Sequence, residues 1–201
     1  MKTRTLQYFV IFWITLSVIY YYFVPYFLVV LQFFIMLIGF FAWAFYQIIK
    51  TIQEIRALSR QRILSTLAAI TLFLCTLYRI PNRLIEKVDW HIYYSRRTKI
   101  VELAKIGKLN SNVSWNEWIC QLPYEFPIVS NGGNDIGIRR NKSTGKITVS
   151  FFVFRNFFSA PSTYFVYTND PNEIKTINEL MENDPDNNWK IDKNWYRTHH
   201  E

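Results

Sequence analysis

The first fifty residues of the chain are dominated by one long apolar run. No charged residue occurs from Gln7 to Ile49, a stretch of 43 positions. As a single α-helix this stretch would be about 64 Å long, roughly twice the thickness of a bilayer core. Pro25 lies within it among tyrosines that suit the headgroup level, and proline disfavours helix at the residue before it. The pattern therefore predicts two antiparallel transmembrane helices over residues 7–23 and 26–48.

A shorter apolar stretch follows after a polar connection. Ile63 to Tyr78 is 16 residues without a charge, bracketed by Arg62 and Arg79. This length is marginal for a bilayer core but adequate if the two arginines extend toward the headgroups. We therefore expect a third span over residues 63–79 and a transmembrane region over residues 1–80. The alternative is a helix that is buried against the other two or lies in the membrane interface.

Residues 81–201 carry the patterns of a separate soluble domain. Pro81 can begin a helix that continues to Ile92, and a second helical pattern from Ile100 to Ala104 ends at Gly107. Segment 115–127 combines two prolines with large aromatic side chains. We expect that segment to be irregular chain.

From Ile128 the pattern changes to strands, of which residues 146–154 are the clearest. Apolar side chains alternate there with Thr148 and Ser150 before Phe152, which predicts one face buried throughout and the other buried only toward Phe152. The other expected elements are turns at 131–135 and 141–145, strands at 136–139 and 162–168, a helix at 171–182 and a strand or extended segment at 189–196. The expected fold class is N-terminal transmembrane α-helices, a hairpin plus a third helix, followed by a small α+β domain with an antiparallel sheet and one or two helices.

The charge distribution refines the membrane interpretation. The net charge of +8 divides into +6 for residues 1–89 and +2 for residues 90–201. Most of the excess flanks apolar segments, which is typical of contact with anionic lipid, so we expect the bilayer rather than a nucleic acid as a partner.

Basic residues are shared equally between the two sides of a three-span chain, six against six. With two spans the domain would be cytoplasmic, and with three spans and a cytoplasmic N-terminus it would lie outside. We expect three spans and an extracytoplasmic domain.

Side chains for metal or cofactor chemistry are sparse. His91, His199 and His200 are the only histidines, and Cys75 and Cys120 lie 45 positions apart. These spacings match no metal-ligand set and no disulfide framework, and we interpret the terminal histidine pair as a frayed tail. We expect no metal and no cofactor.

Nucleophilic catalysis lacks its usual signatures as well. The chain has no nucleophile elbow and no cysteine-histidine motif. Gly132 and Gly133 lack the Lys-Ser or Lys-Thr that completes a phosphate-binding loop, so they predict a turn. We expect the protein not to be an enzyme.

One basic cluster is a candidate for binding. Arg139, Arg140 and Lys142 surround a predicted hairpin, and Arg155 follows the clearest strand. Together they could contact a phosphate, an anionic headgroup or an acidic protein partner. The alternative is a solvated hairpin tip plus one arginine paired with a carboxylate. Arg155 lies among phenylalanines, so we expect it to be partly desolvated and to have a partner.

Three segments carry a resemblance to other proteins: residues 82–90 (NRLIEKVDW), 122–136 (LPYEFPIVSNGGNDI) and 152–158 (FVFRNFF). In these segments the chain resembles a family of small uncharacterised bacterial membrane proteins with N-terminal transmembrane helices and a C-terminal soluble domain. The resemblance implies a multi-pass protein of the bacterial cell membrane. It implies no activity and no site residues.

These patterns favour a non-enzymatic, membrane-anchored binding module, such as an immunity or envelope-sensing protein. The alternative is a ligand-sensing membrane effector that oligomerises through its spans. The spans carry no charged residue for a pore and only Gly39 as a small helix-contact glycine, which disfavours that alternative. An enzyme acting on a lipid or envelope substrate ranks third, because carboxylates such as Glu125 and Asp135 have no catalytic arrangement.

Overall fold

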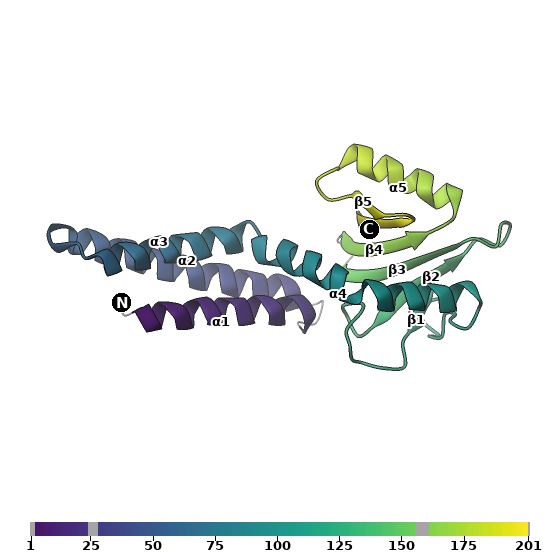
Figure 1. Cartoon of the computed structure of the whole chain (residues 1–201), viewed down its shortest axis with the longest axis horizontal. Coiled ribbons are helices and arrows are strands. Elements are labelled where there is room, and N and C mark those ends of the chain that lie inside the picture. Colours follow the sequence, from purple (N-terminus) through teal and green to yellow (C-terminus); the bar gives the residue numbers. More distant parts are fainter. Residues whose placement is uncertain (1–2, 24–27, 156–160, 201) are drawn as a thin grey trace. The chain divides into compact units, whose positions relative to one another are not determined.

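The computed structural model describes residues 3–23, 28–155 and 161–200. The chain divides into two compact units, Met1–Val88 and Asp89–Glu201. Figure 1 shows their elements, coloured along the sequence. Below, the first is called the membrane unit and the second the domain.

Three apolar helices make up most of the membrane unit: α1 (Thr3–Tyr22), α2 (Val29–Gln53) and α3 (Arg60–Leu77). Two stretches, Arg4–Tyr22 and Val30–Gln53, are long and apolar enough to cross a membrane. A third crossing is counted if α3 and the next helix, α4 (Ile80–Lys105), form one span bent by 65°. Many large apolar side chains on α1 and α2, among them Phe12 and Phe41, are exposed, as expected for surfaces that face lipid.

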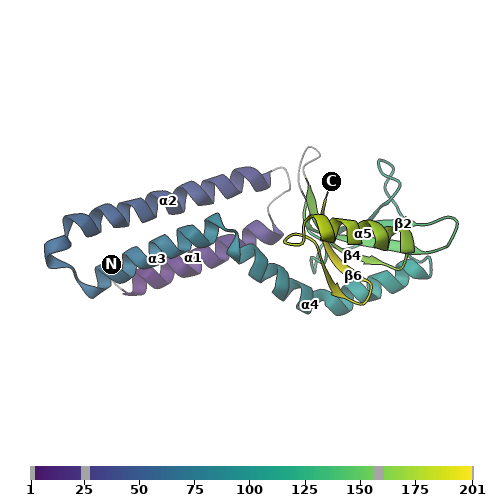
Figure 2. The ribbon, with the colours of Figure 1, turned by 90° about the horizontal axis from the view of Figure 1, so that it is seen from above.

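Interhelical contacts hold α3 along the other two helices (Figure 2). The Trp13 indole N–H donates to Thr76 Oγ1 at 2.9 Å, which joins α1 to α3. The Phe41 and Phe73 rings lie 5.6 Å apart between α2 and α3. The chain then turns at Arg79, whose φ of 52° ends the helical path. The predicted break at Pro25 lies outside the described residues.

The domain is built on a six-stranded antiparallel sheet in the order β1-β2-β3-β4-β6-β5. The strands are β1 (Ile119–Gln121), β2 (Asp135–Arg140), β3 (Ile147–Phe154), β4 (Ser162–Thr168), β5 (Trp189–Asp192) and β6 (Trp195–His200). Side chains alternate between the two faces of each strand. On β4, Phe165 packs against Trp90 of α4, while Tyr164 joins a cluster with Ile177 of α5 (Pro171–Asn183). One helix therefore covers each face of the sheet.

The structure confirms the predicted fold class, with apolar helices followed by an α+β domain. It corrects four local predictions. The helices expected at 81–92 and 100–107 are one continuous α4, and the irregular segment contains β1. Residues 189–196 belong to a β5–β6 hairpin, so His199 and His200 lie in a strand rather than in a frayed tail. Both faces of β3 are buried along nearly its whole length, because a helix covers each side of the sheet.

Candidate functional site

The structure separates the predicted basic cluster into two places. Arg140 pairs with Ile147 at one end of the β2–β3 hairpin. Arg155 lies eight residues after Ile147, which corresponds to about 26 Å along an extended chain. The four candidate side chains therefore do not form one site.

Three of these four side chains are engaged within the domain. Arg139 lies 5.5 Å from the Trp118 ring, and Arg140 donates to the Ala104 carbonyl at 2.7 Å. Arg155 forms an ion pair with Asp135 at 3.0 Å, and it is partly buried, as predicted. Lys142 is exposed in the turn. Contact of these residues with an anion or partner stays a prediction.

A buried ion pair in α4 escaped the sequence reasoning. Arg97 Nη2 lies 2.6 Å from Asp89 Oδ2, with side chains only 3% and 1% exposed. Its Nε donates to the Val129 carbonyl at 2.9 Å, and the guanidinium lies 4.8 Å from the Phe165 ring. The pair thereby fastens α4 to the segment before β2. The spacing of eight residues between Asp89 and Arg97 would have predicted this pair only if residues 89–97 had been expected to form one continuous helix.

Asn134 organises the loop before β2, residues 122–134. Its Oδ1 accepts from the backbone N–H groups of Val129 at 2.8 Å and Ser130 at 3.1 Å. Its Nδ2 lies 3.0 Å from each of three loop carbonyls, those of residues 124, 125 and 127. Asn134 is fully buried and has a φ of 58°, a left-handed conformation that asparagine tolerates better than most residues.

Ser130 ties the same loop to the sheet. Its hydroxyl accepts from the Phe152 N–H at 2.8 Å and donates to the Asp135 carbonyl. The Asn131 side-chain amide donates to the Val153 carbonyl at 2.6 Å. The loop backbone is thus held by buried hydrogen bonds on several sides, and its conformation exists before anything binds.

A pocket of about 610 Å³ opens between this loop and α4. Its lining residues are Arg96, Lys99, Ile100, Leu103, Tyr124, Phe126 and Pro127. Cations from α4 and aromatic side chains from the loop therefore share one cavity, and Phe126 is 65% exposed there. Burial raises the pKa of the Tyr124 phenol, and the charge of Arg96 partly opposes that rise. Sequence reasoning missed this pocket because α4 and the loop are joined only in the folded domain.

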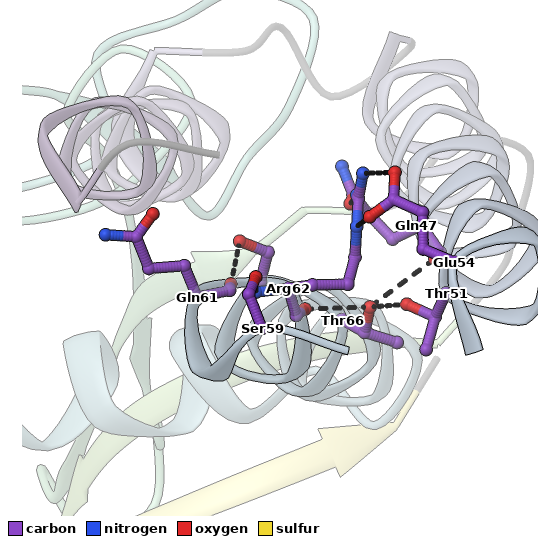
Figure 3. Close-up of polar contacts among 8 residues, drawn as sticks. Gln47, Thr51, Glu54, Ser59, Gln61, Arg62 and Thr66 are labelled. Carbon is purple, nitrogen blue, oxygen red and sulfur yellow. Dashed lines mark hydrogen bonds and ion pairs between the residues drawn. The ribbon is translucent and has the colours of Figure 1, made fainter. Parts of the chain in front are cut away.

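A second polar cluster lies in the membrane unit, at the connection between α2 and α3 (Figure 3). Arg62 binds both carboxylate oxygens of Glu54, at 2.9 and 2.7 Å, and donates to Gln47 Oε1 at 2.9 Å. The Thr51 and Thr66 hydroxyls are 2.6 Å apart. The hydrogen bond from Arg62 lowers the pKa of the Glu54 carboxyl. These contacts close the helical hairpin.

Within residues 3–23, 28–155 and 161–200, no three His, Cys, Asp or Glu side chains are grouped as a metal site requires. Burial raises the pKa of the Cys120 thiol, which makes it a poor nucleophile.

Comparison with known proteins found no matching family model, no matching curated protein and no matching solved structure. The function of this chain is therefore inferred from its own geometry.

Proposed function

We propose that the chain is a non-enzymatic, membrane-anchored binding module of the bacterial cell membrane, such as an immunity or envelope-sensing protein. One observation carries the proposal: a rigidly held loop exposes Phe126 beside Arg96 and Lys99 of α4. Aromatic side chains, phenylalanine among them, and arginines are enriched in the cores of protein interfaces.

Folding alone does not account for this loop. A phenylalanine that is 65% exposed gains little from burial within the chain. The loop below it nevertheless keeps its shape through Asn134, Ser130 and the contact of Arg97 with Val129. A loop that is ordered in advance loses less conformational entropy when a ligand binds. Rigid backbone with exposed aromatic side chains is therefore the arrangement expected of a binding surface.

The proposed topology has three spans and an extracytoplasmic domain. The 18 residues of α3 extend about 27 Å, close to the thickness of a bilayer core. Because α3 is bonded to α1 through Thr76 and packs on α2 through Phe73, it would accompany them through the bilayer. Basic residues stand at both ends, with Arg62 at the first turn and Arg79 4.7 Å from the Phe33 ring. This arrangement suits snorkelling into both headgroup layers.

Cysteine labelling in intact cells tests the topology. Cys75 and Cys120 are replaced by serine and alanine, and Lys175, exposed on α5, is replaced by cysteine. Labelling by a membrane-impermeant maleimide before lysis is the result expected for three spans. Protection until the cells are opened would mean two spans and a cytoplasmic domain.

Site-specific photo-crosslinking tests the binding function. A benzophenone amino acid is placed at position 126 of the full chain in its host, with Lys175 as the matched exposed control on α5. We expect a discrete adduct from position 126 that the control does not form. Equal or absent crosslinking at the two positions would overturn the proposal that this loop is a binding surface.

A further inference from the structure

We propose that the pocket between α4 and the Tyr124–Pro127 segment binds a phosphate ester. The phosphate would lie on Arg96 and Lys99, and the organic part would lie against Tyr124 and Phe126. This inference rests on the proposed binding function of the same surface and names the class of ligand.

The cations of the pocket are available to an anion. Arg96 and Lys99 are three residues apart on α4, so their side chains are neighbours on one face of the helix. Both are exposed, and in the described part of the chain neither forms an ion pair. The nearby carboxylate Glu102 is paired with Lys105 at 2.6 Å. Two unpaired cations side by side can hold one phosphate through charge-assisted hydrogen bonds.

The opposite wall of the pocket suits an organic group. Phe126 presents an exposed aromatic face, and Tyr124 combines an apolar ring with a polar hydroxyl. Leu103, Ile100 and Pro127 complete the lining. A volume of about 610 Å³ has room for more than a bare phosphate and lies in the usual range for small-molecule sites. The pocket therefore fits an anion joined to an apolar or flat group better than an inorganic ion.

Two sources could supply this chemistry: an anionic phospholipid of the bilayer, or a soluble ester such as a nucleoside monophosphate. Ile92 lies on the same face of α4 as Arg96 and Lys99, and Ile106 follows directly after the last residue of the helix; both isoleucines are largely exposed. Spacings of four and three residues place Ile92, Arg96 and Lys99 on one stripe of the helix. Exposed apolar side chains next to basic ones suit contact with an anionic membrane surface, which favours the lipid.

Binding to the full-length protein in detergent micelles separates these sources. Dihexanoyl phosphatidylglycerol, adenosine monophosphate and inorganic phosphate are each titrated, with isothermal calorimetry for affinity and native mass spectrometry for stoichiometry. The pocket variant is Arg96→Gln with Lys99→Gln. The matched control is Lys190→Gln with Lys193→Gln, which removes the same charge, three residues apart, from the exposed β5–β6 hairpin. Phe126→Ala tests the aromatic wall.

We expect one of the two esters to bind with one molecule per chain. The pocket variant should bind it about 25-fold more weakly, about fivefold per cation lost, whereas the control should be unchanged. Saturation by phosphatidylglycerol assigns the bilayer as the source, and saturation by adenosine monophosphate assigns a soluble ester. Phe126→Ala should weaken binding of the ester without changing binding of inorganic phosphate.

Three results would overturn the inference: no saturable binding of either ester, inorganic phosphate binding as tightly as the ester, or loss of binding in the control rather than in the pocket variant. Failure of the binding function itself is recognised separately by crosslinking. An adduct between position 126 and a protein, with no binding of either ester, would support the proposed binding function. It would overturn the inference that the ligand is a phosphate ester.

Discussion

Each of the two units contains an arginine paired with a carboxylate, and the two pairs differ in their contact with solvent. In the membrane unit, Arg62 binds Glu54 with side chains 16% and 46% exposed. In the domain, Arg97 binds Asp89 with side chains 3% and 1% exposed. Both arginines also bond a further oxygen, that of Gln47 in the first case and that of Val129 in the second. The two ion pairs are chemically alike, but the buried Arg97–Asp89 pair lies in surroundings of lower dielectric constant than the Arg62–Glu54 pair.

This difference decides what each pair does. An exposed pair is screened by water and contributes little to the free energy of unfolding, so the Arg62 cluster mainly sets the geometry of the helical hairpin. A buried pair balances a large desolvation cost against a strong attraction, and removing one partner leaves an uncompensated charge. Substitution of either Arg97 or Asp89 should therefore disturb the contact between α4 and the loop of residues 122–134.

The largest expected effect is that of Asp89→Asn. It leaves the Arg97 charge buried without its carboxylate, so the domain should lose about 3–5 kcal/mol of stability. Hydrogen exchange of the β3 and β4 amides, followed by mass spectrometry on the full chain in micelles, measures the loss. Adding Arg97→Met should restore part of the protection, because it removes the stranded charge. Unchanged exchange in the single variant would refute the role given to this pair.

Asn134→Ala should rank second. It removes the buried amide that supports the loop backbone and places alanine at a φ of 58°, so we expect a loss of about 2–4 kcal/mol. Hydrogen exchange in residues 122–134 should rise most. Asn110→Ala is the control, because Asn110 is exposed and its side chain bonds the Gly107 carbonyl of a surface turn. Equal exchange in the two variants would mean that Asn134 does not organise the loop.

Two glycines extend the comparison to packing. A Cβ at Gly137 would lie 2.8 Å from the Trp118 ring, whereas a Cβ at Gly39 in α2 would meet none of the described atoms within 4 Å apart from its own helix backbone and chain neighbours. Gly137→Ala should therefore cost about 1–3 kcal/mol by overpacking. Gly39→Ala should be neutral or slightly stabilising, because alanine favours helix. Thermal unfolding in detergent checks both, and destabilisation by Gly39→Ala would point to a neighbour on α2 from a second copy of the chain.

Glu54→Gln should have the smallest effect. It matches Asp89→Asn in chemistry, but the carboxylate is exposed, so unfolding in detergent should change little at neutral pH. Arg62 lowers the pKa of Glu54 in the folded chain, so the stabilisation exists above the ordinary pKa of glutamate and is lost as the pH falls through the lowered value. Glu54→Gln should remove this acid-side dependence. A loss as large as that of Asp89→Asn would contradict the contrast between the units.

The sequence predicted those parts of the fold that leave a local periodic signal. The uncharged run from Gln7 indicated the apolar helices, and alternation indicated β3. The continuity of α4 was missed because residues 93–98 are all polar or aromatic, and Arg97, the buried residue among them, is covered by Phe165 of the sheet. The β5–β6 hairpin was missed because its turn uses Asn194 at a φ of 65°, without a glycine to mark it.

The candidate site shows the same limit more strongly. The basic residues of the β2–β3 hairpin were conspicuous in the sequence, yet the fold engages Arg139 and Arg140 with Trp118 and Ala104. Arg96 and Lys99 entered the sequence argument only through the count of basic residues on the two sides of the membrane, and Phe126 only as part of an irregular segment. The sequence by itself determined that the chain has apolar helices and an α+β domain, because burial of one face repeats with the period of the element. Only the tertiary structure decided which cations meet which aromatic rings, because α4 and the loop of Phe126 become neighbours only after both have folded onto the same sheet.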